Sequence, residues 1–199
     1  MVAIYFLAVL RKNSAKSVIL SSVSDLSEFG FFQKRSVKEF MHFSSVILVE
    51  RTEPDVKVSV QQQGYMCNAF VRPDNLAAVV VTDDEYPTTK AHTCLTHLLN
   101  AFSSSIKPEI WALSDADLEF PEIKTIFKMF SNPVKEPVSA AGLEEELDET
   151  KIILHKTVVG ILRRGENLDD LIRTADDISE QSKAFYKSAR KSNSCCTAL

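Results

Sequence analysis

The feature that most constrains this chain is a long stretch, residues 140–192, in which small and apolar side chains recur at alternating spacings of three and four residues. Such a repeat places one continuous stripe along a helix, and no proline interrupts it. Alanine, serine and threonine occupy many stripe positions, so the stripe is too small and too polar for a stable two-stranded coiled coil. We therefore predict one long helix that joins a larger bundle. Its layer positions are Leu143, Leu147, Leu154, Ile161, Leu168, Leu171, Ala175, Ile178, Phe185 and Ala189.

One arginine interrupts this stripe. Arg164 falls at a layer position near the middle of the repeat, whereas its neighbour Arg163 is one position out of phase. A guanidinium group is always charged and carries five donors, so burying it without acceptors costs several kcal/mol. A polar residue at one layer position can fix the register and the number of helices in a bundle. We therefore expect other helices to supply acceptors for Arg164. The alternative is that the helix shifts slightly and the side chain reaches solvent.

The composition excludes several classes of function. With 23 basic and 27 acidic residues and a formal net charge of −4, the chain lacks the basic excess of a nucleic-acid-binding protein. No run of about 18 apolar residues could cross a membrane as a helix. The phosphate-binding loop of a GTPase and the common catalytic motifs are missing, which argues against an enzyme. His92, Cys94 and His97 lack the spacing of a zinc site. We expect no catalytic residues and no metal.

The first 132 residues have the texture of a mixed α+β domain. Segments rich in β-branched and aromatic residues, separated by Gly64 and by other turn-forming residues, predict five strands. Ser36 followed by Glu39 has the pattern of a capping box at a helix start, and Thr88 is a candidate cap for a second helix. We expect a five-stranded antiparallel sheet with helices on both faces. The strands are predicted near 2–11, 17–23, 56–63, 65–72 and 76–82, and the helices near 36–51, 88–105 and 121–132.

Two prolines and several small residues separate this part from the helical repeat. We therefore divide the chain into a domain at 1–132, a linker at 133–139, a coiled-coil motif at 140–192 and a tail at 193–199.

The tail ends in two adjacent cysteines followed by Thr-Ala-Leu. The last four residues fit the C-a-a-X prenylation signal, with Cys196 as the prenylated thiol, and Leu199 favours a geranylgeranyl group over a farnesyl group. Four-residue matches also occur by chance, so an unmodified cysteine pair is the alternative. The only cofactors that we expect are covalent isoprenoid and acyl lipids.

Several segments together resemble one known family. The sequence "ELDETKIILHKTVVGILRRGENLDDLIRTADDISEQSKAFYKSARK" resembles the SNARE motif of the synaptobrevin class, whose central layer residue is arginine. That position corresponds to Arg164. The segments "DLSEFGFFQKRSVKEFM", "DDEYP" and "NSCC" extend the resemblance over essentially the whole chain. The chain is similar to the prenylated longin-domain R-SNAREs, which are vesicle SNAREs without a transmembrane helix.

This resemblance implies a longin (profilin-like) fold for the N-terminal domain and a mechanical function for the SNARE helix. The helix would zipper with three Q-SNARE helices (Qa, Qb and Qc) into a parallel four-helix bundle that drives membrane fusion in vesicle transport. Three glutamines of the partners would accept hydrogen bonds from Arg164. The expected location is a cytosolic pool together with the cytoplasmic face of Golgi, ER-derived vesicle, endosomal or vacuolar membranes.

The resemblance also implies how the chain is anchored and regulated. A prenyl transferase would modify Cys196, and Cys195 would carry a palmitoyl or second prenyl group, so that the membrane surface is reached through lipid anchors. Phe43 and Val46 would form a groove in the longin domain that receives the SNARE segment or the lipid, giving an intramolecular longin–SNARE contact. A phosphate on Ser182 would place negative charge in the seam and block zippering.

Two alternatives remain open at this stage. Phe43 could be an ordinary core residue. The chain could also be a lipid-anchored trafficking adaptor or tether that does not itself drive fusion, in which case replacement of Arg164 should have no effect on its interactions.

Overall fold

The computed structural model describes residues 3–14, 16–62, 64–115, 117–131 and 151–195, with side chains up to residue 188. Its central feature is a six-stranded sheet with the strand order β2-β1-β5-β4-β3-β6. The strands are β1 Ile4–Arg11, β2 Val18–Ser24, β3 Val56–Gln62, β4 Tyr65–Val71, β5 Leu76–Asp83 and β6 Ile152–His155. The first five strands pair antiparallel, as predicted, whereas β6 pairs parallel with β3.

Two turns fix the register of the central strands. Gly64 has a φ angle of +81° between β3 and β4, and Asn75 has a φ angle of +69° between β4 and β5. Glycine adopts this left-handed backbone conformation without strain, and asparagine tolerates it better than most residues. The two turn signals of the sequence therefore produce the predicted meander.

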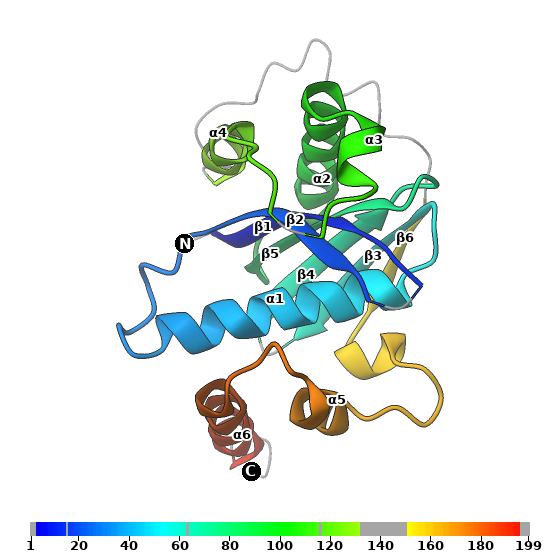
Figure 1. Ribbon diagram of the computed structural model, residues 1–199. Helices are drawn as coiled ribbons and strands as arrows, with labels where there is room; N and C mark the ends of the chain where they lie inside the picture. The colour runs from blue at the N-terminus through cyan, green and yellow to red at the C-terminus, as the bar shows by residue number, and fades with distance from the viewer. Residues whose placement is uncertain (1–2, 15, 63, 116, 132–150, 196–199) are drawn as a thin grey trace.

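Helices cover both faces of this sheet. They are α1 Lys34–Arg51, α2 Thr88–Ser105, the short α3 Pro108–Trp111 and α4 Glu122–Phe130. Figure 1 shows α2, α3 and α4 on one side of the sheet and α1 on the other. The predicted arrangement of helices on both faces is confirmed.

Each face of the sheet has its own hydrophobic core, because successive side chains of a strand point to opposite faces. In β1, Leu7 and Val9 join the core beneath α2 and α4. Phe6, Ala8 and Leu10 of the same strand join the core beneath α1. All five side chains are fully buried, so β1 is the central layer between the two groups of helices.

The helix starts differ from those predicted. The α1 helix begins at Lys34, and Ser36 is buried within its first turns, so the predicted capping box does not form. Glu39 has other partners, which belong to the C-terminal segment. The α2 helix likewise begins at Thr88 itself, after Pro87, without a side-chain cap.

The C-terminal segment is not the continuous helix predicted for 140–192. From residue 151 onward it consists of β6, a 3-10 turn η1 at Val158–Ile161, α5 at Leu168–Thr174 and α6 at Glu180–Cys195. The predicted linker 133–139, the layer positions Leu143 and Leu147, and Cys196 lie outside the described residues.

The broken helix has a physical cause. An isolated helix is stable only when its apolar stripe is packed, and a glycine within a helix costs about 1 kcal/mol relative to alanine. Gly160 lies in the middle of the predicted helix. The β-branched pair Ile152 and Ile153 suits a strand, and the edge of β3 offers it a hydrogen-bonding partner. The sheet therefore has six strands where the sequence predicts five, and the sixth comes from the segment predicted to be helical.

Candidate functional site: the interface between α1 and the C-terminal segment

Helices α5 and α6 of the C-terminal segment pack on the side of α1 that faces away from the sheet (Figure 1). Phe43 and Ile47 of α1, each 8% exposed, pack in one cluster with three side chains of the C-terminal segment. These three are Ile172 of α5, Ile178 and Tyr186 of α6. Complete burial of an apolar side chain of this size stabilises by about 1.5–3 kcal/mol, so the cluster contributes substantially to holding the segment in place. Phe43 thus lies on a second apolar face of α1, and not in the core between α1 and the sheet.

An aromatic stack extends this contact toward the start of α1. The rings of Phe40 and Tyr186 lie 5.0 Å apart with an interplanar angle of 22°. They border an apolar cavity of about 300 Å³ that is also lined by Phe29, Tyr65 and Phe185. This volume lies at the lower end of the range for small-ligand pockets. Neither of the predicted groove residues, Phe43 and Val46, lines this apolar cavity. Both line a second, polar pocket between α1, β2 and the connection from α5 to α6.

Glu39 of α1 binds the N-terminus of α6. Its Oε2 atom accepts hydrogen bonds from the N–H of Ser179 at 2.9 Å, from Oγ of Ser179 at 2.7 Å and from Oγ of Ser182 at 2.8 Å. Nε of Arg35 donates to Oε1 at 2.9 Å. Burial alone would raise the pKa of the Glu39 carboxyl, but these donors, led by Ser179, lower it to about 2. A carboxylate at this position also complements the positive end of the α6 dipole.

A second polar contact joins the end of α1 to the middle of the C-terminal segment. Arg51 donates from Nε and Nη2 to the two carboxylate oxygens of Glu166, at 2.9 and 2.8 Å. The N–H of Arg163 donates to the same carboxylate at 2.9 Å. The hydrogen bond from Arg51 is the main reason that the pKa of Glu166 is lowered. The Arg51 side chain is 9% exposed, so this bidentate pair is largely shielded from solvent.

Arg164 lies next to this pair and is exposed to solvent. Gly165, with a φ angle of +89°, turns the chain between Arg164 and Glu166. The turn directs Glu166 to Arg51 while Arg164 remains exposed. In this structure the cation predicted for the centre of the bundle is therefore not buried, and the desolvation cost of burying it does not arise.

The strand β6 ties the segment to the edge of the sheet. Lys57 to Val60 of β3 pair with Ile152 to His155 of β6. Leu154, a predicted layer residue, is 64% exposed. Gly160, after β6, lies so close to His155 that a Cβ atom there would be 3.0 Å from Nδ1 of the imidazole. A side chain larger than that of glycine at this position would therefore require the His155 ring to shift by a few tenths of an ångström.

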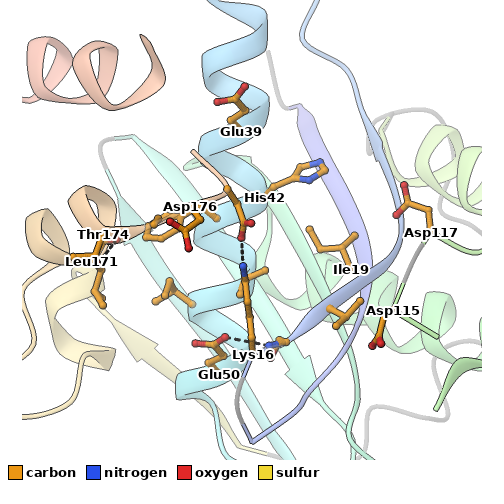
Figure 2. A pocket seen from close by; sticks show the side chains of 17 residues that line it. Lys16, Ile19, Glu39, His42, Glu50, Asp115, Asp117, Leu171, Thr174 and Asp176 are labelled. Carbon is orange, nitrogen blue, oxygen red and sulfur yellow. Dashed lines mark hydrogen bonds and ion pairs between the residues drawn. The ribbon is translucent and has the colours of Figure 1, made fainter. Parts of the chain in front are cut away.

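A polar pocket lies beside the apolar cluster, between α1, β2 and the connection from α5 to α6 (Figure 2). Lys16 forms an ion pair across it with Asp177, and Glu50 accepts a hydrogen bond from the N–H of Ser17 at 3.1 Å. These contacts connect the β1–β2 turn to the segment before α6. The acidic residues that line the pocket are Glu39, Glu50, Asp115, Asp117, Asp176 and Asp177.

The remaining predicted layer residues lie along the same interface. Ile161 and Phe185 pack against the α1 side of the sheet, and Leu168, Leu171 and Ala175 are partly buried around the Phe43 cluster. Ile178 is buried. Ala189 and Cys195 belong to α6, but their side chains lie outside the described ones. Six described layer residues therefore contact the N-terminal domain or its cluster, whereas Leu154 is mostly exposed.

Sequence reasoning missed the polar part of the interface. The sequence pattern assigns Glu39 to a capping box with Ser36, and Arg51 and Glu166 appear there as ordinary charges of amphipathic helices. Phe40 appears there as part of the core stripe. The one available signal was that Phe40 and Phe43 are three residues apart, which indicates a second apolar face on the same helix.

Comparison with known proteins finds two family models that match different parts of the chain. Residues 26–127 match the model of the longin family, described as a regulated-SNARE-like domain, and residues 139–196 match the synaptobrevin family model. A protein named synaptobrevin homolog Ykt6 from Schizosaccharomyces pombe is 40% identical over 193 residues, covering 97% of this chain and 98% of the relative. The protein of that name from Saccharomyces cerevisiae is 37% identical over 200 residues, covering 98% of this chain and 99% of the relative.

In the described part of the chain, no helix is long and apolar enough to span a membrane. The family matches cover both the N-terminal domain and the C-terminal segment, and the relatives align over nearly their whole length. These matches confirm the resemblance that the sequence motifs indicate. The chain belongs to the synaptobrevin family as a longin-domain R-SNARE, a non-enzymatic class of protein that acts in vesicle trafficking.

Proposed function

We propose that this chain drives intracellular membrane fusion by zippering with three Q-SNARE helices (Qa, Qb and Qc) and that the folded-back arrangement is its closed, autoinhibited form. One observation carries the proposal. Layer residues between Ile161 and Phe185 have the spacing of a single helix, yet they are packed on the longin domain in separate pieces. A side chain that is packed on α1 is not available to a partner helix. Zippering therefore requires release of the segment.

Arg164 is the residue that ties the open form to fusion. In a parallel four-helix bundle its guanidinium group would occupy the central layer, where three glutamine carbonyls accept its donors. Only one alignment of the helices brings these groups together, so the residue sets the register. Burial of the other layers would release free energy, and this release would pull the lipidated end toward the partner membrane.

The test is assembly of the full chain with three Q-SNARE helices into a denaturant-resistant complex of four chains. Arg164→Leu should lower the thermal midpoint of the complex, because the three glutamines lose their donor. Arg163→Leu is the matched control, since this neighbouring side chain is exposed and out of phase, and it should leave the midpoint unchanged. If the complexes of both variants have the same thermal midpoint, the result would favour the alternative that the chain is a trafficking adaptor or tether that does not itself drive fusion.

We also propose that Cys196 carries a prenyl group and Cys195 a palmitoyl or second prenyl group. A single lipid gives reversible membrane binding and two give a stable anchor. The closed form would account for a cytosolic pool, and the open form for residence on the cytoplasmic face of Golgi, ER-derived vesicle, endosomal or vacuolar membranes. Cys196→Ser should abolish incorporation of an isoprenoid by prenyl transferase, whereas Cys195→Ser should retain it. Incorporation into Cys196→Ser would refute this assignment.

A further inference from the structure

The polar pocket between α1, β2 and the connection from α5 to α6 has the size of a small-molecule site. Its volume is about 560 Å³, which lies within the usual range for ligand pockets. Both parts of the chain line it, since Glu50 belongs to α1, Ile19 to β2 and Asp176 to the connection. The pocket is therefore complete only while the C-terminal segment is folded back on the longin domain.

Most of the acidic residues around this pocket already have a cationic partner. These ion pairs are Arg11–Asp115, Lys16–Asp177, Arg35–Glu39 and Arg51–Glu50. Asp117 and Asp176 are both exposed, and within the described part of the chain neither takes part in an ion pair. Burial lowers the pKa of His42, so this lining residue is neutral at pH 7, and the nearby cation that contributes to the shift is Lys38. Two unpaired carboxylates thus face one exposed cation, and the pocket remains negative.

The two unpaired carboxylates come from different parts of the fold. Asp117 precedes α4, and Asp176 follows α5. Figure 2 shows them on opposite sides of the view, with Lys16 and His42 between them. The same pocket also has apolar lining residues, which are Val18, Ile19, Phe43, Val46, Ile47, Leu171 and Ala175. The pocket therefore offers negative charge at two separate places together with an apolar surface.

A buried hydroxyl of this pocket has no partner. Ser17 is 3% exposed, and its N–H donates to Glu50 at 3.1 Å. Its Oγ atom is buried and has no hydrogen-bond partner among the described residues, and the same is true of Nε2 of His42. Both residues line the pocket. A buried polar atom without a partner is costly, and a serine hydroxyl can accept as well as donate. A ligand with N–H donors would satisfy it.

We propose that the polar pocket binds a linear polyamine, with one ammonium group beside Asp117, another beside Asp176 and methylene groups against the apolar lining. An ammonium group only donates hydrogen bonds, which suits carboxylates and the Ser17 hydroxyl. Aliphatic chains with charged ends cover apolar surface while the ends stay near water, and both carboxylates are exposed. A single lysine side chain fits less well, because it brings one charge to two unpaired carboxylates.

Binding at this place has a consequence for the fold. Asp117 belongs to the longin domain and Asp176 to the C-terminal segment, so a polyamine held by both would join the two parts. A ligand that binds one conformation stabilises that conformation. This consequence rests on the proposed closed form. Binding itself does not depend on zippering, so it can be measured with the full chain in the absence of partners.

The experiment is isothermal titration calorimetry of the unlipidated full chain with spermidine at low ionic strength, and one saturable site per chain is expected. Butylamine, which has a single ammonium group, should bind about tenfold more weakly or worse. Asp117→Asn with Asp176→Asn should weaken spermidine binding by about tenfold, because two ion pairs are lost. Ser17→Ala should weaken it by about fivefold or more. The thermal midpoint of the free chain should not fall in Ser17→Ala, since the hydroxyl has no partner to lose.

The matched control removes two exposed carboxylates elsewhere. Asp84→Asn with Glu85→Gln should leave spermidine binding unchanged. These residues follow β5, whose end pairs with the start of β1, whereas Val18 of the pocket pairs with the end of β1. The proposal is overturned if spermidine shows no saturable binding, if butylamine binds equally well, or if the two double variants bind spermidine with the same affinity.

A second readout separates this proposal from the proposed function. Spermidine should slow the assembly of the wild-type chain with three Q-SNARE helices, and it should have little effect on Asp117→Asn with Asp176→Asn. Saturable binding that leaves the assembly rate unchanged would support the polyamine site and contradict the autoinhibitory role of the closed form.

Discussion

Ser182 shows how one side chain can belong to two different packing states. In the proposed bundle it is a layer residue. In the closed form Ser182, at the start of α6, is 3% exposed, and its hydroxyl donates to Glu39 of α1. A phosphate here would add about −1.5 to −2 charges beside a carboxylate. The sequence alone predicts that such a phosphate blocks zippering. The structure adds a second expected effect, which is release of α6 from α1.

The first prediction concerns this contact. Ser182→Asp should detach α6, because two carboxylates would face each other where a hydrogen bond now forms. Losing hydrogen bonds to a charged group costs about 1.5–3 kcal/mol, so amide hydrogen exchange in residues 183–188 should accelerate about tenfold or more. Gln181→Asp is the control, since Gln181 is exposed on the same turn. Similar exchange rates in the two variants would show that Glu39 does not hold α6 in place.

The second prediction concerns the pH dependence of stability and His92, a buried residue of α2, on the side of the sheet opposite α1. His92 is 2% exposed, and its Nε2 lies 2.9 Å from Oγ of Ser59, whose own proton is donated to Asn68. Nε2 must therefore carry the imidazole proton, and the buried Nδ1 has no hydrogen-bond partner among the described residues. Burial, with a smaller contribution from Lys57, lowers the pKa of His92 to about 4. Protonation would create a buried charged donor without an acceptor.

The sign of the effect follows from linkage. The unfolded chain binds a proton near pH 6.5, about 2.5 units above the folded chain, so His92 favours folding above pH 6.5 and this contribution is lost as the pH falls toward 4. The loss is about 3 kcal/mol. His92→Gln keeps a donor for Ser59 but does not titrate. Its free energy of unfolding in urea should therefore fall less between pH 7 and about pH 4 than that of the wild type. A parallel decline would refute the buried, neutral histidine.

At the scale of secondary structure elements, the C-terminal segment has two competing conformations. Residues 152–161 form β6 and η1 here, whereas the repeat of layer residues favours a helix. Neither conformation is fully favoured locally. Ile152 and Ile153 suit a strand, while the absence of proline and the spacing of three and four residues suit a helix. Tertiary contacts decide between them, so the element type could not be read from the sequence alone.

The third prediction shifts this balance. Gly160→Ala should favour the helix by about 1 kcal/mol through propensity. It should also disfavour η1, because the new Cβ atom would lie 3.0 Å from Nδ1 of His155. Circular dichroism of the full chain should show more helix, and hydrogen exchange in β6 should accelerate. Ala184→Gly is the control, because α6 is helical in the closed form and in the proposed bundle. No change in β6 exchange would mean that Gly160 is not important for the closed form.

At the scale of the whole molecule, the N-terminal domain could be predicted well and the placement of the C-terminal segment could not. Alternating apolar residues and the turn signals at Gly64 and Asn75 specify the strands by local rules. The contacts Glu39–Ser182 and Arg51–Glu166 join residues more than a hundred positions apart, and no local pattern indicates them. Phe43 lies between these cases, since its helical position marks a second apolar face but does not identify what covers it.

The most direct measurement of the central claim is the rate at which the full chain assembles with three Q-SNARE helices. The closed form buries Phe43 at 8% exposure against Ile172, Ile178 and Tyr186. Phe43→Glu would place a charge in this cluster, favour the open form, and should accelerate assembly by about tenfold or more, given that burying an unpaired charge costs several kcal/mol. Phe32→Glu, at an exposed position, is the control and should leave the rate unchanged. Equal rates for the wild type and Phe43→Glu would contradict the claim that the longin domain withholds the SNARE segment from its partners.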